Sequence, residues 1–136
     1  MKKFKNVILV LTLLGTASYI YAINYVRGET MSVSKAEKKW GKREFGAEQF
    51  KSASEANRAS MAASLIRNKK QFIGKDRSEI RKLLGDYSGH YVSGMFPTYL
   101  IQDAIKIGDE AWQIVFLLDA DEKVKDIVVH KNCCYN

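Results

Sequence analysis

The sequence has few of the residues that favour disorder, such as proline, and few of the cysteines that form disulfide cross-links. Its 136 residues include one proline and two cysteines. Hydrophobic residues make up 46% and charged residues 27%, which is the composition of a folded protein rather than of a disordered one. Behind an N-terminal extension of roughly 25 residues the chain is long enough for one hydrophobic core but not for two. We therefore expect a single domain.

The motifs of common enzymes are also missing. There is no Gly-x-Ser-x-Gly turn, no His-Glu-x-x-His pair and no glycine loop with the spacing that holds phosphate. The dipeptide Gly74-Lys75 is too short for a phosphate loop, and we interpret it as the entry to a helix. The sequence therefore predicts no catalytic residue and no cofactor.

The remaining candidates for metal chemistry are weak. His90 and His130 have no neighbours at metal-ligand spacing, and we expect His90 to face outward from an edge strand. The carboxylates of Asp119, Asp121 and Glu122 are hard oxygen donors, but their spacing does not match a calcium loop. A solvated hairpin turn explains them better, so we predict no metal site.

The two cysteines, Cys133 and Cys134, are adjacent in a C-terminal tail, residues 132–136. Neighbouring cysteines can close only a strained ring, so ordinary disulfide geometry is not open to them. An intermolecular bridge, a redox-labile ring, two free thiols and a soft-metal pair all stay open as readings of this candidate thiol site.

The N-terminus has the pattern of an exported protein. A basic start without acidic residues precedes residues 7–26, which are 20 residues without a charge, and Arg27 follows. The basic residues of that start are Lys2, Lys3 and Lys5. Lysines stay on the cytoplasmic side while the apolar run enters lipid. We therefore expect the domain in the bacterial periplasm.

Two fates of residues 1–27 stay open. Small residues at Ala17 and Ala22 offer cleavage sites for a signal peptide. Alternatively, a helix of this length rises about 1.5 Å per residue and spans roughly 30 Å, the thickness of the hydrocarbon layer, so the segment also suits a membrane anchor. No cysteine stands directly after the apolar run, so we expect no N-terminal lipid anchor.

We interpret residues 28–51 as a linker followed by an aromatic segment, which Gly41 and Gly46 interrupt and which forms either a helical turn or an irregular arm that docks its aromatic side chains. The first helix is predicted from about residue 53 to 68, behind a capping box of Ser52 and Glu55. A second capping box, Asp76 with Glu79, opens a shorter helix that ends at Gly85.

After Gly85 the pattern becomes that of strands, rich in β-branched and aromatic residues. The predicted strands are residues 87–93, 98–102, 111–118 and 124–130. We expect an α+β domain over residues 52–131, with two helices packed on one face of a three- to four-stranded antiparallel sheet.

Residues of the predicted helices, of the turn between them and of two later strands resemble the pattern of a known family. The residues that carry it are Arg58, Met61, Phe72-Ile73-Gly74-Lys75, Ser78-Glu79-Ile80, Leu83-Leu84-Gly85, Trp112 and the strand from Val124. This pattern resembles the SmpA/OmlA outer-membrane assembly lipoproteins, the BamE type, and the related β-lactamase inhibitory protein fold. The resemblance implies a helix–helix–sheet domain that works by binding. The lipidated cysteine of those lipoproteins is missing here.

Charge is distributed unevenly along the chain. Residues 32–82 hold 14 basic and 6 acidic side chains, whereas residues 83–136 hold 4 basic and 8 acidic ones. Seven basic residues form a candidate patch for an acidic protein or an anionic membrane surface: Arg67, Lys69, Lys70, Lys75, Arg77, Arg81 and Lys82. Export removes nucleic acid from the partners we expect.

Three functions follow as hypotheses. The first is a non-enzymatic envelope protein that binds another protein and serves envelope assembly or maintenance. The alternative is a periplasmic inhibitor or immunity protein that blocks an enzyme or toxin. The third is an enzyme or thiol–redox protein that depends on Cys133 and Cys134.

Overall fold

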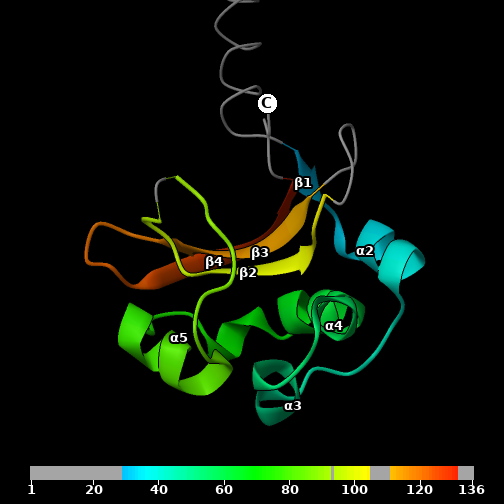
Figure 1. Cartoon of the computed structure of the whole chain (residues 1–136). Coiled ribbons are helices and arrows are strands. Elements are labelled where there is room, and N and C mark those ends of the chain that lie inside the picture. Colours follow the sequence, from blue (N-terminus) through cyan, green and yellow to red (C-terminus); the bar gives the residue numbers. More distant parts are fainter. Residues whose placement is uncertain (1–28, 93, 105–110, 132–136) are drawn as a thin grey trace, which may run out of the picture. The chain divides into compact units, whose positions relative to one another are not determined.

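The computed structural model describes residues 29–92, 94–104 and 111–131 of the chain. Those from Thr30 onward belong to one compact unit. Its helices are α2 (Val33–Trp40), α3 (Ala47–Lys51), α4 (Glu55–Arg67), the 3-10 turn η1 (Lys69–Gln71) and α5 (Arg77–Leu84). Its strands are β1 (Thr30–Met31), β2 (Thr98–Gln102), β3 (Trp112–Leu118) and β4 (Val124–Lys131) (Figure 1).

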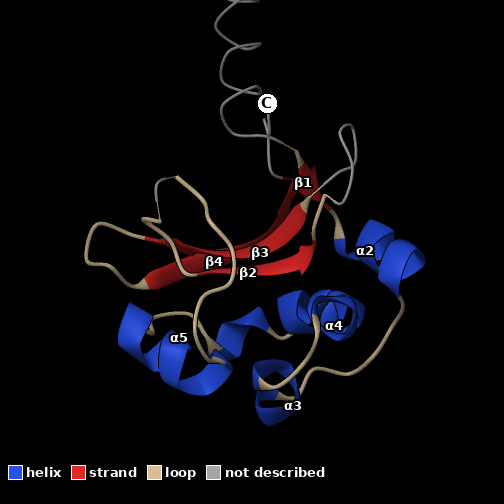
Figure 2. Cartoon of the chain, viewed as in Figure 1, coloured by secondary structure: helices blue, strands red, loops and turns tan. Residues whose placement is uncertain are grey.

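The strands form one antiparallel sheet in the order β1-β4-β3-β2. The helices lie together on one face of this sheet, as Figure 2 shows. The predicted α+β class is confirmed. The described residues form four α-helices, however, and not two, because the segment before α4 is itself helical.

Helix α5 begins and ends where the sequence predicted. The carboxylate of Asp76 accepts the backbone N–H of Glu79 at 2.9 Å, and the Glu79 side chain accepts the N–H of Asp76 at 2.9 Å. Gly85 ends the helix with φ +86°, a conformation that L side chains rarely adopt. Both ends of α5 are thus set by local sequence.

The predicted capping box of α4 is wrong. Ser54 is the N-cap, and its hydroxyl accepts the N–H of Asn57. Ser52 instead ends α3, where its hydroxyl donates to the carbonyl of Glu48 at 3.2 Å. Two serines lie close together here. Ser52 caps the end of α3, so Ser54 is left to cap the start of α4.

The segment expected to be linker and aromatic arm holds β1, α2 and α3. Its three aromatic side chains dock on the rest of the domain. Trp40 contacts Trp112 edge to face, with ring centroids 6.0 Å apart. Phe50 is fully buried in the core, and Phe45 packs against Phe50 and Phe72 at the edge of that core.

Residues 87–92 do not form the predicted strand, whose last residue, 93, lies outside the described part of the chain, and β1 supplies the fourth strand. The segment runs beside β2 for a short distance, where Gly89 donates its N–H to the carbonyl of Thr98 at 3.0 Å. The next bond to β2 comes from a side chain, because the hydroxyl of Ser88 accepts the N–H of Leu100. A regular ladder is therefore not made.

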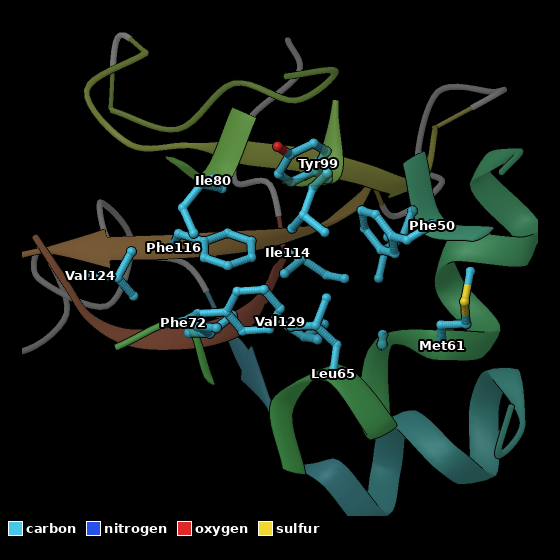
Figure 3. Packing of buried hydrophobic residues seen from close by; sticks show 14 of the residues in the cluster. Phe50, Met61, Leu65, Phe72, Ile80, Tyr99, Ile114, Phe116, Val124 and Val129 are labelled. Carbon is cyan, nitrogen blue, oxygen red and sulfur yellow. The ribbon is translucent and has the colours of Figure 1, made fainter. Parts of the chain in front are cut away.

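Five aromatic rings form a closed circuit in the core. Their centroids are 5.4–5.9 Å apart around the sequence Phe45, Phe50, Tyr99, Phe116, Phe72 and back to Phe45. Each contact is tilted or edge to face, the arrangement that aromatic quadrupoles favour. Figure 3 shows four of these rings between the sheet and the helices. The circuit joins α3, the turn before α5, β2 and β3.

We predict that Phe72→Ala lowers the free energy of unfolding by about 3–5 kcal/mol, because it opens the circuit and leaves a cavity. Tyr99→Phe is the matched control. It keeps the ring and loses only the hydrogen bond from the phenol to the carbonyl of Gly85 (2.9 Å), at about 1–3 kcal/mol. Urea unfolding followed by tryptophan fluorescence measures both free energies. If Phe72→Ala is as stable as Tyr99→Phe, the ring circuit does not stabilise the domain in the way proposed.

Candidate functional site

Four residues of the predicted basic patch are ion-paired within the domain. Their pairs are Arg67 with Glu37, Lys69 with Asp126, Arg77 with Glu122 and Arg81 with Asp86. The bond from Lys69 lowers the pKa of Asp126 below its ordinary range. Three of the four acids come from the acidic half of the sequence. Much of the charge asymmetry is therefore compensated inside the fold.

The other three members of that patch, Lys70, Lys75 and Lys82, have no ion pair among the described residues. Lys75 is also tied by its backbone, because its carbonyl accepts the N–H of Val124 at 2.8 Å. The free positive charge of this region is thus smaller than the sequence indicated.

The candidate thiol site, Cys133 and Cys134, lies outside the described residues. Within the described residues no three His, Cys, Asp or Glu side chains gather at metal-binding distance. The carboxylate of Asp119 serves its own hairpin turn, where it accepts the N–H groups of Asp121 (2.9 Å) and Lys123 (3.0 Å). This is the local role that short acidic side chains take in turns.

The connection between α5 and β2 forms a structure that the sequence did not predict. We call it the strap, residues 88–92 and 94–96. Figure 1 shows it leaving α5 on the helix side of the sheet and rising to the other side. Side chains alternate along a strand, so Gln113 and His130 point away from the face on which Ile114 and Val129 meet the helices. The strap lies over Gln113 and His130.

Gln113 holds the strap by both ends of its amide. Its oxygen accepts the backbone N–H of His90 at 3.2 Å, and its nitrogen donates to the carbonyl of His90 at 2.9 Å. Gln113 is fully buried, so these bonds satisfy a polar group that would otherwise be costly to bury. His90 itself is exposed, but on the strap and not on the predicted strand.

Gly89 allows this close approach. A Cβ at this position would lie 2.6 Å from Cγ2 of Thr98 and 2.8 Å from Oε1 of Gln113. Its backbone N–H is also the one that bonds to Thr98. No other residue fits here unless the strap moves off the sheet.

His130 lies beneath the strap with 3% of its surface exposed. Its ring meets the ring of Tyr91 edge to face, with centroids 4.6 Å apart. Neither ring nitrogen has a hydrogen-bond partner in the described part of the chain. Burial lowers the pKa of the imidazole, because desolvation disfavours the charged form. The strap therefore covers a neutral histidine.

The tip of the strap exposes two apolar side chains. Val92 is 51% exposed and Met95 is 57% exposed. The tip is closed by bonds from the N–H of Gly94 to the carbonyl of Tyr91 (3.2 Å) and from the N–H of Met95 to the carbonyl of Val92 (3.1 Å). Arg77 also donates to the carbonyl of Gly94 at 3.4 Å. The tip is thus held from several directions.

Val92 adopts φ +46°, which is a strained conformation for a β-branched residue. Such strain costs on the order of 1–3 kcal/mol and persists only where the surroundings enforce it. Val92 and Met95 are exposed and apolar, and the strap holds them in a fixed conformation. They are therefore the candidate site for binding a partner. Sequence reasoning missed it, although a lone glutamine in the apolar run of β3 could have indicated a buried polar clamp.

Comparison with known proteins finds no family model, no curated protein and no solved structure that matches this chain. The likeness to the BamE type therefore stays a prediction. Among the described residues no helix is long and apolar enough to cross a membrane, and residues 7–26 lie outside them.

We predict that acid weakens the domain through His130. The unfolded histidine titrates near pH 6.5, whereas the folded one holds its proton only at lower pH. The unfolded state then binds more protons below pH 6.5, so stability falls as the pH drops, by up to about 1.4 kcal/mol per pH unit. Asp76 and Asp126 have lowered pKa values, and their contribution is lost only below pH 3.8.

Urea unfolding between about pH 5 and 7 measures this effect. His130→Gln has no titrating ring, and its stability should be flat in that window. His90→Gln is the control, because this histidine is exposed, and it should keep the slope of the wild type. Equal slopes in the wild type and His130→Gln would show that the buried ring is not the cause.

Proposed function

We propose that this chain is a non-enzymatic protein of the bacterial cell envelope that acts by binding another protein through the tip of the strap. The observation that carries the proposal is the exposed pair Val92 and Met95 on a connection that is bonded to the sheet below it. Methionine adapts its shape to a partner surface. A loop already held in place loses less entropy when it binds.

The polar groups that could have done chemistry serve the fold instead. Gln113 binds the strap, Asp119 closes its own turn and Asp76 caps α5. His130 packs beneath Tyr91 and is buried from solvent. These roles favour binding over catalysis as the function of the described domain.

The proposed location is the periplasm, either as a free domain after cleavage or as a domain anchored to the inner membrane. Its support is the charge-free run of residues 7–26 behind three lysines. A role in envelope assembly or maintenance is supported by the order of α4, α5 and the antiparallel meander, which is the order that the resemblance to BamE-type proteins implies.

The second candidate function is inhibition of an enzyme or toxin, in the manner of an immunity protein. The strained conformation of Val92 favours it. A pre-organised loop with an apolar tip can fill an active-site cleft without rearranging, and such complexes show little backbone movement on binding. The two candidates share the same surface and differ in whether the partner loses an activity.

We predict that a photo-crosslinking amino acid at position 95 captures a discrete partner in living cells, whereas the same probe at Lys70 does not. Gly89→Ala, which forces the strap off Thr98 and Gln113, should abolish the crosslink although the probe is still present. Purified partner assayed with and without the chain then separates scaffolding from inhibition. Identical products from positions 95 and 70 would refute binding by the tip.

We also predict that Val92→Gly separates stability from binding. Glycine relieves the strain of positive φ, about 1–3 kcal/mol, but its freer unfolded chain costs about 1 kcal/mol, so the variant should be as stable as the wild type or more stable by about 1 kcal/mol. It removes half of the apolar pair, so crosslinking from position 95 should fall about tenfold. Thermal unfolding and band intensity measure the two effects. A fall in both together would point to a structural role for Val92 alone.

A further inference from the structure

Helix α2 carries a stripe of exposed lysines. Lys35, Lys38 and Lys39, with Lys42 just beyond the helix, are spaced i, i+3, i+4 and i+7, which places them on one face. The other face is docked on the domain. Ala36 is 1% exposed, and Trp40 donates its indole N–H to the side-chain oxygen of Gln102 at 3.1 Å.

The charge of this stripe is not balanced by the helix itself. The one acid of α2 is Glu37, which pairs with Arg67 of α4 and, at 3.9 Å, with Lys42. The remaining lysines of the stripe, Lys35, Lys38 and Lys39, have no ion pair among the described residues. This contrasts with the patch on α4 and α5, where most charges are paired.

Helix stability explains only part of the stripe. Lys38 and Lys39 lie in the last turn, where a positive charge interacts well with the helix dipole. Lys35 lies in the first turn, where the dipole disfavours it, and no acid is present there to offset it. The position of Lys35 is therefore not explained by the stability of the helix.

Few residues separate the lysine stripe from the apolar segment. Residues 7–26 carry no charge, and β1 starts at Thr30, where it pairs with His130 of β4. Four residues of chain reach at most about 14 Å. Ser32 follows β1 directly as the N-cap of α2. A membrane that holds residues 7–26 is therefore within reach of the lysines.

We propose that Lys35, Lys38 and Lys39 bind the anionic phospholipid headgroups of the membrane that holds residues 7–26. The inference rests on the proposed envelope location and adds a defined docking face to it. Trp40 lies at the end of the same helix, with the ammonium of Lys39 5.6 Å from its ring. The indole itself is docked on the domain, so Trp40 reports how close α2 lies to a membrane and is not part of the lipid-binding face.

The test uses the full chain in nanodiscs of phosphatidylcholine, with or without phosphatidylglycerol. Lysine acetylation followed by mass spectrometry reports each side chain. We expect the reactivity of Lys35, Lys38 and Lys39 to fall at least about fivefold in anionic discs, since each lysine near an anionic surface gains roughly that factor. High salt should restore it. Lys70 and Lys82 are internal controls and should not change.

A second readout uses the triple variant Lys35→Gln, Lys38→Gln, Lys39→Gln and a spin-labelled headgroup that quenches tryptophan fluorescence. Trp112 is 3% exposed, so quenching reports mainly on Trp40. The triple variant should lose the quenching that the wild type shows in anionic discs. A control of equal charge change, Lys70→Gln, Lys75→Gln, Lys82→Gln, should keep it.

Three results would overturn the inference. Equal lysine reactivity in both kinds of disc would exclude the lipid. Protection in cells but in neither disc would assign the stripe to an acidic protein. A native N-terminus beginning after residue 22 would remove the tether. Crosslinking from position 95 tests the proposed partner independently, because the stripe variants leave the strap unchanged.

Discussion

The closed circuit of Phe45, Phe50, Tyr99, Phe116 and Phe72 is the contact on which the domain depends. It brings together parts of the chain that are far apart in sequence, and no single helix or strand holds more than one of its rings. Short elements of five to eight residues cannot be stable alone. They become stable because each packs apolar side chains into the same core: α3 and β2 contribute rings of the circuit, and α5 contributes Ile80 and Leu84.

The two faces of the sheet are covered in different ways. The helix face buries apolar side chains, which require only close packing. The outer face buries Gln113 and His130, and polar groups there need partners. Gln113 finds them in the backbone of the strap, which fixes the path of a long connection. The exposed position of Val92 and Met95 follows from that path, so the candidate site depends on a buried amide.

Local signals predicted some elements and failed for others. Helix α5 has a reciprocal capping box and a glycine with positive φ, so residues close in sequence determine where it begins and ends. The strands β2, β3 and β4 follow their β-branched and aromatic composition. The strap was mistaken for a strand because it has the same composition, while its path is decided by Gln113, more than twenty residues away. Helices α2 and α3 were not predicted as two separate helices, because Gly41 and Gly46, which cap them, break the segment into pieces too short for a clear helical pattern.

Strand β1 has only two residues, and it is the first described strand after the apolar segment. It pairs with Val129 and His130 at the edge of β4. A mechanical load on the N-terminal segment therefore reaches this pairing before it reaches the aromatic core. Two pairs of residues resist such a load far less than the long β3–β4 ladder does. The domain thus has its shortest strand pairing next to the N-terminal segment, and loss of that pairing would expose an edge of β4 to which another strand could add.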